Sequence, residues 1–272
     1  MNNIHEKFKK DGYVVVKNIC DKSKLNNVLR TFCKTYLKKN PSSKFLTHKK
    51  PWSSKNFHKE IFNFRKQNKD EFGEIFDICR NSITVNEIVT DKNILKTVSK
   101  LLNTDPIFIT SYENVVRMDV PYDKRNKTAW HQEVQFFNNP GLVMWLPLVK
   151  INKESGLLNI LKGSQAEGEL DFTINRKFNY SKTRSANCEI PKKTLKRLFM
   201  NYKKIKIKVG FGDVLFFDNY LLHSSGKNKS SFIRFVTNTR FFDSNSNEYV
   251  AHRPALLYNP YSMKKFSNRK FY

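Results

Sequence analysis

The first part of the chain carries apolar side chains at helical spacing among many basic ones. Its opening predicts a short helix, a turn at Asp11-Gly12 and an apolar strand from Tyr13 to Val16. A second helix follows, for which Asp21 is a suitable N-cap. The apolar residues of this second helix predict one buried stripe, made of Leu25, Val28, Leu29, Phe32 and Tyr36.

Two further segments before residue 105 differ in kind. Residues 38–70 are basic, polar and rich in turn-forming residues, which predicts a loop or lid. Residues 92–103 again have apolar side chains at helical spacing and predict a third helix. We therefore expect residues 1–105 to form a mostly helical N-terminal part that contains a basic loop.

From residue 106 the pattern changes to short β-branched or aromatic segments separated by Gly, Asn, Asp and Pro. Such segments are typical of an antiparallel sandwich or barrel, so we expect a mainly β fold with flanking helices. A long basic insert with one short helix interrupts them at about 167–204. Because the chain shows no internal repeat and no clean boundary, we expect a single domain over residues 1–272, with its β core at 106–245 and a C-terminal extension at 246–272.

The composition, 39% hydrophobic and 14% aromatic, is that of a packed globular protein. The sequence has no apolar stretch long enough for a signal peptide or a membrane span, which predicts a cytoplasmic protein. Its four cysteines form no CxxC pair, so neither a disulfide framework nor a zinc ribbon is indicated. We expect mostly buried, reduced thiols at Cys20, Cys33, Cys79 and Cys188.

The formal net charge of +26 attracts polyanions but does not determine the fold. Codon bias in an AT-rich genome gives the same excess of Lys, Asn, Ile and Phe, and is the simpler explanation. Aromatic residues among lysines, as in FMNYKKIKIK, leave a nucleic-acid-binding protein as an alternative, although no recognition motif supports it. We expect two lids, the loop at 38–70 and the basic insert at about 167–204. Their lysines and arginines would also attract a substrate with a phosphate or carboxylate group, and a solvated basic face is the simpler alternative.

The segment Trp130-His131-Gln132-Glu133 is the most informative for chemistry. In a strand, residues i and i+2 point to the same face, so His131 and Glu133 can hold one ion together. His223 follows 92 residues after His131 and would complete two histidines and one carboxylate, the facial triad of non-haem iron(II) oxygenases. A lone His-x-Glu is more often an ordinary side-chain pair, so its context decides.

Two residues near His223 supply that context. Arg234 lies 11 residues after His223 in an apolar strand, and a guanidinium is a natural bidentate partner for the distal carboxylate of 2-oxoglutarate. Ser225, two residues after His223, would add a hydroxyl donor to the same carboxylate. A strand-end salt bridge is the alternative role for Arg234.

Three segments resemble the phytanoyl-CoA dioxygenase family: WHQEVQFF, GLVMWLPLVKINKESGLLNILKGSQ and GDVLFFDNYLLHSSGKNKSSFIRF. The opening FKKDGYVVVKNI is similar to that family's start, whereas residues 38–105 and 165–204 match nothing in it. The resemblance implies a double-stranded β-helix, which is a cupin-like jelly-roll barrel with flanking helices. It also implies a dioxygenase that uses Fe(II), 2-oxoglutarate and O2 to hydroxylate a substrate, with release of succinate and CO2.

Carried over residue by residue, the resemblance assigns iron to His131 and His223, and 2-oxoglutarate to Arg234 and Ser225. Trp145 would line the cosubstrate pocket, although a Trp in an apolar strand serves core packing as often. Arg117, on the strand before the triad, would face the cavity. The remaining histidines have no ligand-like partners and are expected at the surface: His5, His48, His58 and His252.

Glu133 departs from the family, whose carboxylate ligand is normally Asp. Its additional methylene group moves the oxygen farther from the backbone, so we expect iron to bind after a shift of the metal or the backbone. The alternative is a catalytically impaired member that binds a ligand without turnover, and Glu133 is its only support in the sequence. A halogenase is disfavoured because such enzymes replace the carboxylate with a small residue. The family leaves the substrate open, and we expect a small, anionic organic molecule.

Overall fold

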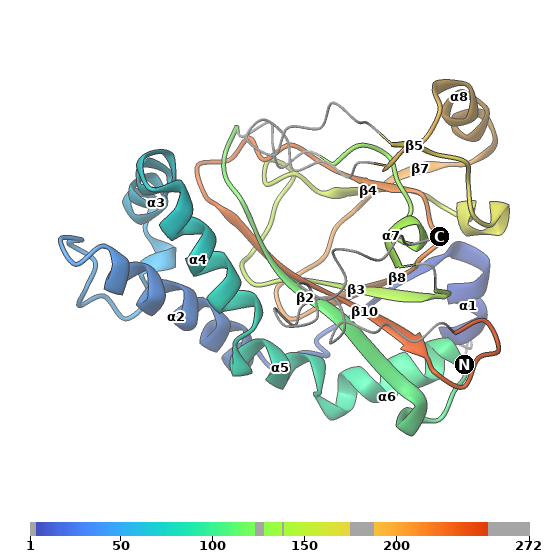
Figure 1. Cartoon of the computed structure of the whole chain (residues 1–272), viewed down its shortest axis with the longest axis horizontal. Helices are drawn as coiled ribbons and strands as arrows, with labels where there is room; N and C mark the ends of the chain where they lie inside the picture. Colours follow the sequence, from blue (N-terminus) through green and yellow to red (C-terminus); the bar gives the residue numbers. More distant parts are fainter. Residues whose placement is uncertain (1–3, 123–127, 138, 175–187, 250–272) are drawn as a thin grey trace, which may run out of the picture.

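Two main antiparallel sheets, a short two-stranded sheet and several helices make up the described part of the molecule (Figure 1). The computed structural model describes residues 4–122, 128–137, 139–174 and 188–249. The larger sheet has the order β1-β8-β3-β10-β2, and its strands are β1 (Tyr13–Val16), β8 (Val214–Asp218), β3 (Gly141–Pro147), β10 (Arg234–Asp243) and β2 (Ile109–Asp119). The smaller sheet has the order β7-β4-β9, with β7 (Lys204–Ile207), β4 (Leu158–Leu161) and β9 (His223–Ser225).

Alternation along the strands of the larger sheet sends their side chains to two different cores. Phe235 of β10 packs with the helices, whereas its neighbour Val236 packs between the two sheets. The same alternation separates Met144 from Trp145 in β3. Because both faces are covered, these strands read as nearly continuous apolar runs. The core between the sheets contains residues of both, including Leu158 of β4 and Ile207 of β7.

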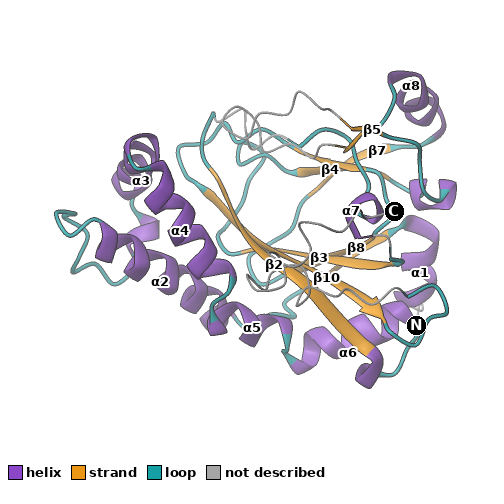
Figure 2. Cartoon of the chain, viewed as in Figure 1, coloured by secondary structure: helices purple, strands orange, loops and turns teal. Residues whose placement is uncertain are grey.

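The helices α2 to α6 lie along the other face of the larger sheet (purple in Figure 2). The predicted second helix is confirmed as α2 (Lys22–Lys39), whose N-cap Asp21 accepts a hydrogen bond from the Ser23 amide. The five apolar residues predicted for its stripe are all buried. The opening helix is α1 (Ile4–Asp11), and the helix predicted at 92–103 is α6 (Lys92–Leu102).

The prediction of a loop over residues 38–70 is wrong for its second half. After a short 3-10 turn, η1 (Pro51–Ser53), residues from 55 onward form α3 (Lys55–Gln67). The residues Phe57, Ile61 and Phe64 recur at helical spacing and are buried, and this stripe outweighs the basic composition of the segment. Two helices that the sequence analysis did not predict follow, α4 (Lys69–Arg80) and α5 (Ile83–Val89).

The basic insert contains α8 (Lys192–Asn201), as predicted, together with the short strands β5 (Thr173–Ile174) and β6 (Cys188–Glu189). Short 3-10 turns are η2 (Pro106–Phe108) and η4 (Ser164–Glu167). The rest of the insert, at 175–187, and the C-terminal extension from residue 250 lie outside the described residues. The single-domain organisation stays a prediction.

Helices and antiparallel sheets occur together, as predicted, but the described part is mixed instead of mainly β, because its helices take up more residues than its strands. The thiols of Cys20, Cys33 and Cys79 are buried and unpaired, as predicted. None of the helices in the described ranges is both long and apolar enough to cross a membrane. The cytoplasmic location stays a prediction.

Candidate metal centre

The two histidines of the predicted triad lie side by side on neighbouring segments. His131 and His223 form an isolated antiparallel bridge, in which each backbone amide donates to the other residue's carbonyl at 3.0 and 3.1 Å. The Glu133 amide donates to the carbonyl of Asn219 at 2.9 Å, and the helix α7 (Val134–Phe137) begins directly afterwards. The prediction that residues 131–133 form a strand is therefore wrong: a bridge followed by a helix start makes these side chains converge.

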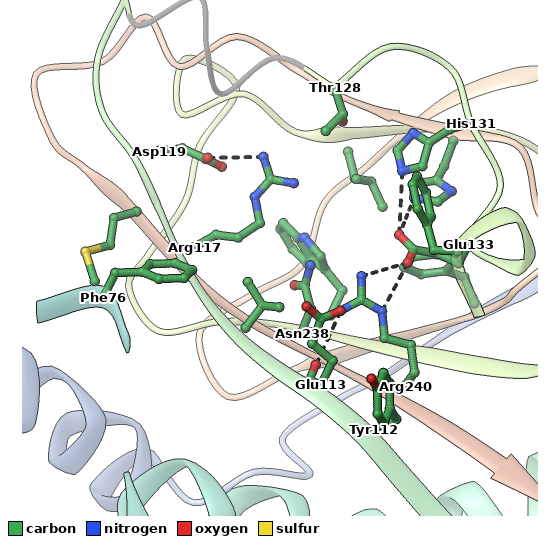
Figure 3. Close-up of a pocket in the computed structure, with 17 residues that line it drawn as sticks. Phe76, Tyr112, Glu113, Arg117, Asp119, Thr128, His131, Glu133, Asn238 and Arg240 are labelled. Atoms are coloured by element: carbon green, nitrogen blue, oxygen red, sulfur yellow. Dashed lines mark hydrogen bonds and ion pairs between the residues drawn. The ribbon is translucent and has the colours of Figure 1, made fainter. Parts of the chain in front are cut away.

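The side chains of His131, Glu133 and His223 are all buried, and Figure 3 shows those of His131 and Glu133 pointing toward each other. Their possible ligand atoms all lie within 4.8 Å of one another. The Oε1 atom of Glu133 lies 3.5 Å from Nε2 of His131 and 3.4 Å from Nε2 of His223. Donor atoms that bind one ion at about 2.1 Å and at right angles lie about 3 Å apart, so these side chains fit a single metal ion. Two histidines and one carboxylate on one side of an ion suit iron(II).

Backbone carbonyls orient both imidazole rings for metal binding. Nδ1 of His131 lies 2.8 Å from the carbonyl of Ala129, and Nδ1 of His223 lies 3.0 Å from the carbonyl of Leu221. A carbonyl only accepts, so both Nδ1 atoms carry the proton and both Nε2 atoms present their lone pairs to the metal position. Burial, together with the neighbouring His131, lowers the pKa of His223 and keeps it neutral, although Glu133 acts in the opposite direction.

Arg240, which the sequence analysis missed, holds the second oxygen of Glu133. Its Nε and Nη2 atoms donate to Oε2 of Glu133 at 3.1 and 2.7 Å, so that Oε1 remains directed at the histidines. Burial alone would raise the pKa of Glu133, but Arg240 and the two histidines outweigh it and hold this pKa well below its usual range. The carboxylate is therefore ionised and oriented without a metal.

A bulge in β2 accompanies this position of Arg240. The register between β10 and β2 shifts between Asn238 and Arg240, and Glu113 in the bulge has a left-handed φ of 50°. The carbonyl of Glu113 accepts a hydrogen bond from Nη1 of Arg240 at 3.4 Å. A sequence signal for Arg240 did exist: it lies an even number of residues after Arg234 on one strand, so both point to the same face.

The triad opens into a cavity of about 460 Å³ between the sheets. Trp145 lines it and also packs in the core between the sheets, and its role in binding the cosubstrate stays a prediction. Arg117 lines it too, as predicted, and its Nη2 atom lies 3.2 Å from Oδ1 of Asp119 (Figure 3). Asn238 and Thr128 complete the polar wall. The cavity therefore contains the metal position, one aromatic wall and several charged groups.

Arg234 and Ser225 lie at the edge of this arrangement. The guanidinium of Arg234 binds Oδ2 of Asp119 through Nε at 2.9 Å and also through Nη2, which is the salt bridge considered as its alternative role. Arg234 lines an adjacent cavity of about 670 Å³ instead of the metal cavity. Ser225 is buried, and its Oγ atom accepts hydrogen bonds from the amide and hydroxyl of Thr128 at 2.7 and 2.8 Å.

The other histidines differ in burial. His48 is exposed, as predicted. The surface prediction is wrong for His58, which is 2% exposed and contacts the carbonyl of Trp52 at 2.8 Å and the amide of Ile233 at 3.0 Å. This histidine joins the N-terminal helices to the start of β10, and its burial lowers its pKa. His5 is half-buried, with Nδ1 3.0 Å from the carbonyl of Leu101, and His252 lies outside the described residues.

The family model for phytanoyl-CoA dioxygenase (PhyH) matches residues 8–236, which include the whole triad. The chain belongs to the PhyH family. It is thus a member of the 2-oxoglutarate-dependent non-haem iron oxygenases, with the facial triad His131, Glu133 and His223, and iron and 2-oxoglutarate are its cofactors. The family fold is a double-stranded β-helix, and the two facing antiparallel sheets agree with it.

Several solved structures have a similar fold at low sequence identity. The epimerase SnoN, in complex with Fe3+, α-ketoglutarate and nogalamycin RO, is 18% identical with a TM-score of 0.56, covering 88% of this chain and 82% of its own. EctD from S. alaskensis, with 2-oxoglutarate and 5-hydroxyectoine, is 15% identical with a TM-score of 0.58. The match covers 89% of this chain and 76% of the EctD chain. EvdO2 from Micromonospora carbonacea var. aurantiaca, with 2-oxoglutarate, is 14% identical with a TM-score of 0.55. The match covers 93% of this chain and 95% of the EvdO2 chain. No curated protein matches the sequence.

Proposed function

We propose that this chain hydroxylates a small, anionic organic substrate and couples the reaction to the conversion of 2-oxoglutarate and O2 into succinate and CO2. The observation that carries the proposal is the convergence of Nε2 of His131, Nε2 of His223 and Oε1 of Glu133 at the end of a cavity. Iron bound there, with 2-oxoglutarate and O2, supplies the oxidising power for attack on an unactivated C–H bond. One oxygen atom enters the substrate and the other enters succinate, so the atoms balance.

The protein's own contribution is to hold the reactants and to limit water. The two histidines need no change of tautomer when the metal binds, because their Nδ1 protons are held by backbone carbonyls. Trp145 is 3% exposed and would pack against the bound reactants. Tight positioning of the target carbon is the main means by which such a site selects one C–H bond.

We propose that the distal carboxylate of 2-oxoglutarate binds at the cluster of Arg117, Asp119 and Arg234, with Ser225 as a further donor. Burial alone would raise the pKa of Asp119, but the two arginines outweigh it and keep this residue ionised. Two guanidinium groups around one carboxylate leave one net positive charge. Nη1 of Arg234 is buried and has no hydrogen-bond partner among the described residues, which supports a role as an anion anchor.

The size and charge of the protein support the proposed type of substrate. A cavity of about 460 Å³ is in the range of small-molecule sites. A net charge of +26 raises the local concentration of anions around the molecule. Both features favour a small anionic compound over a neutral polymer.

The test begins with anaerobic addition of Fe(II) and 2-oxoglutarate, for which we expect a visible metal-to-ligand charge-transfer band. His131→Ala should abolish the band, and Arg234→Ala should require a much higher concentration of 2-oxoglutarate for it. Arg197→Ala, which removes an exposed arginine of α8, is the control and should leave the band unchanged. Absence of the band in the intact protein would refute the proposal. Succinate release in O2 across acyl thioesters, phosphorylated compounds and amino acids would then identify the substrate class.

A second candidate function is binding of a ligand without turnover. The observation that favours it is that Arg240 already pairs with Oε2 of Glu133, so that the carboxylate does not depend on a metal for its charge balance. A charge-transfer band that forms normally, followed by no succinate release with any candidate substrate, would select this function.

A further inference from the structure

Six exposed lysines surround a cavity of about 1010 Å³ on the outer side of the smaller sheet. They come from a loop before β4, from β7 and the residue after it, and from the loop after β9: Lys153, Lys204, Lys206, Lys208, Lys227 and Lys229. We call this cavity the lysine groove. Ile207 of β7 is buried between the sheets, so the alternation of the strand directs Lys206 to the opposite, outer face.

The local composition of the lysine groove exceeds what the basic composition of the chain explains. Six of its fifteen described lining residues are lysines, whereas Lys and Arg together are 50 of the 272 residues of the chain. None of the described lining residues is acidic, although the chain has 24 acidic residues. Codon bias alone would distribute lysines over the surface without excluding carboxylates from one cavity.

Carboxylates of the described residues do not neutralise the six ammonium groups. None of them makes an ion pair with a carboxylate in the described part of the chain, whereas lysines elsewhere do, such as Lys24 with Asp91 at 2.5 Å. Charges of one sign that converge on a concave surface repel one another, and a bound anion relieves this repulsion. The lysine groove therefore favours a ligand with several negative charges.

Neutral donors continue the lysine groove across the smaller sheet. Asn159 of β4 pairs in register with Lys206 on one side and with Ser224 on the other. Nδ2 of Asn159 lies 3.4 Å from Oγ of Ser224. This row offers an ammonium, an amide and a hydroxyl side by side, which is a donor set that phosphate oxygens accept.

We propose that the lysine groove binds an oligophosphate, such as the phosphate chain of a small metabolite. The groove is a bounded cavity with charges on several sides, which matches a compact multivalent anion. A single-stranded nucleic acid is less favoured, because such sites stack bases on aromatic rings. Trp130 is the one aromatic residue among the described lining residues, and its ring is already in contact with Phe199 and with the Lys204 ammonium, at 5.3 Å from each.

The smaller sheet separates this proposed site from the metal cavity. His223 and Leu158 line the metal cavity, whereas Ser224 and Asn159 line the lysine groove. Ser225, the further donor proposed for 2-oxoglutarate, also lines the groove and so borders both sites. The ligand of the groove is therefore distinct from the molecule that is oxidised, and the proposal does not depend on the proposed oxygenase reaction.

The test is calorimetric titration of the full chain with inorganic tripolyphosphate. The triple variant Lys204→Gln, Lys206→Gln and Lys208→Gln should weaken binding about ten- to one-hundred-fold. A matched control removes three exposed lysines from α6, on the far side of the larger sheet: Lys92→Gln, Lys96→Gln and Lys100→Gln. Its charge change is the same, and its affinity should change less than about two-fold. The triple variant Lys204→Arg, Lys206→Arg and Lys208→Arg should still bind tripolyphosphate, because it keeps the three positive charges.

Three results would overturn the proposal. They are the absence of tripolyphosphate binding by the intact chain, equal weakening in the groove variant and the α6 control, and a clear preference for a single-stranded oligonucleotide over tripolyphosphate. His131→Ala should bind tripolyphosphate normally, so the groove is tested even if the oxygenase proposal fails. Both lysine variants should release succinate at the rate of the unaltered chain if the oxygenase proposal holds.

Discussion

The buried pair of Arg240 and Glu133 allows a sharp comparison with a pair at the surface. Arg240→Leu removes the two donors at 3.1 and 2.7 Å from Oε2 of Glu133 and leaves a buried carboxylate without its cation. Breaking a buried ion pair on one side costs about 3–5 kcal/mol of unfolding free energy. The neighbouring histidines reduce this cost only if one of them takes up a proton. We expect Arg240→Leu to lower the unfolding free energy by about 3 kcal/mol, the lower end of this range.

The matched control is Arg197→Leu. Nη1 and Nη2 of Arg197 donate to Oε1 and Oε2 of Glu167 at 3.2 and 2.7 Å. These distances nearly equal those of the buried pair. Its side chain is 49% exposed, and solvent screening leaves such a pair with little effect on the unfolding free energy. The two variants therefore differ mainly in burial.

The assay is urea unfolding at neutral pH in the presence of a chelator, so that no metal replaces the missing cation. The double variant Glu133→Gln/Arg240→Leu completes a cycle and should recover about 1–3 kcal/mol relative to Arg240→Leu alone. Equal losses in Arg240→Leu and Arg197→Leu, or a double variant that is no more stable than Arg240→Leu, would refute the reasoning. Either result would mean that the buried pair is open to water in solution.

Two further predictions concern the carboxyl groups of Glu133 and Asp218. Glu133→Asp shortens the side chain by one methylene group, so the carboxylate should lose its contact with Arg240. Co(II) binding should weaken about ten-fold or more in a spectroscopic titration. Tighter metal binding with faster succinate release would instead indicate that the natural site is impaired. Burial raises the pKa of Asp218 to about 6, above its unfolded value of 3.8, so the folded state loses stability as pH rises through this interval. Asp218→Asn should therefore be more stable than the unaltered chain at pH 7.5 by up to about 3 kcal/mol. This gain should disappear below about pH 4 in unfolding curves measured across the pH range. A gain that does not depend on pH would contradict the raised pKa of Asp218.

The elements that the sequence predicted best are those with local causes. The capped helix after Asp21 and the helix at 92–103 depend on a cap or on a strong apolar period, and both are confirmed. Helix α3 was missed because its lysines and polar residues suggested a loop, although Phe57 and Ile61 recur at helical spacing and are buried against the core. Tertiary burial outweighed local composition there.

The metal ligands were found from residue types and from the resemblance of whole segments, which local sequence preserves. The reason for their convergence was not predicted from the sequence. His131 meets His223 through a bridge between segments 92 residues apart, not within a strand. The sequence by itself determined the triad, the family and the presence of short apolar strands, because side-chain chemistry and local composition can be read along the chain. Only the tertiary structure decided that Arg240 orients Glu133, that Arg234 pairs with Asp119 and that lysines from three segments form one groove, since each depends on how distant strands pair in register.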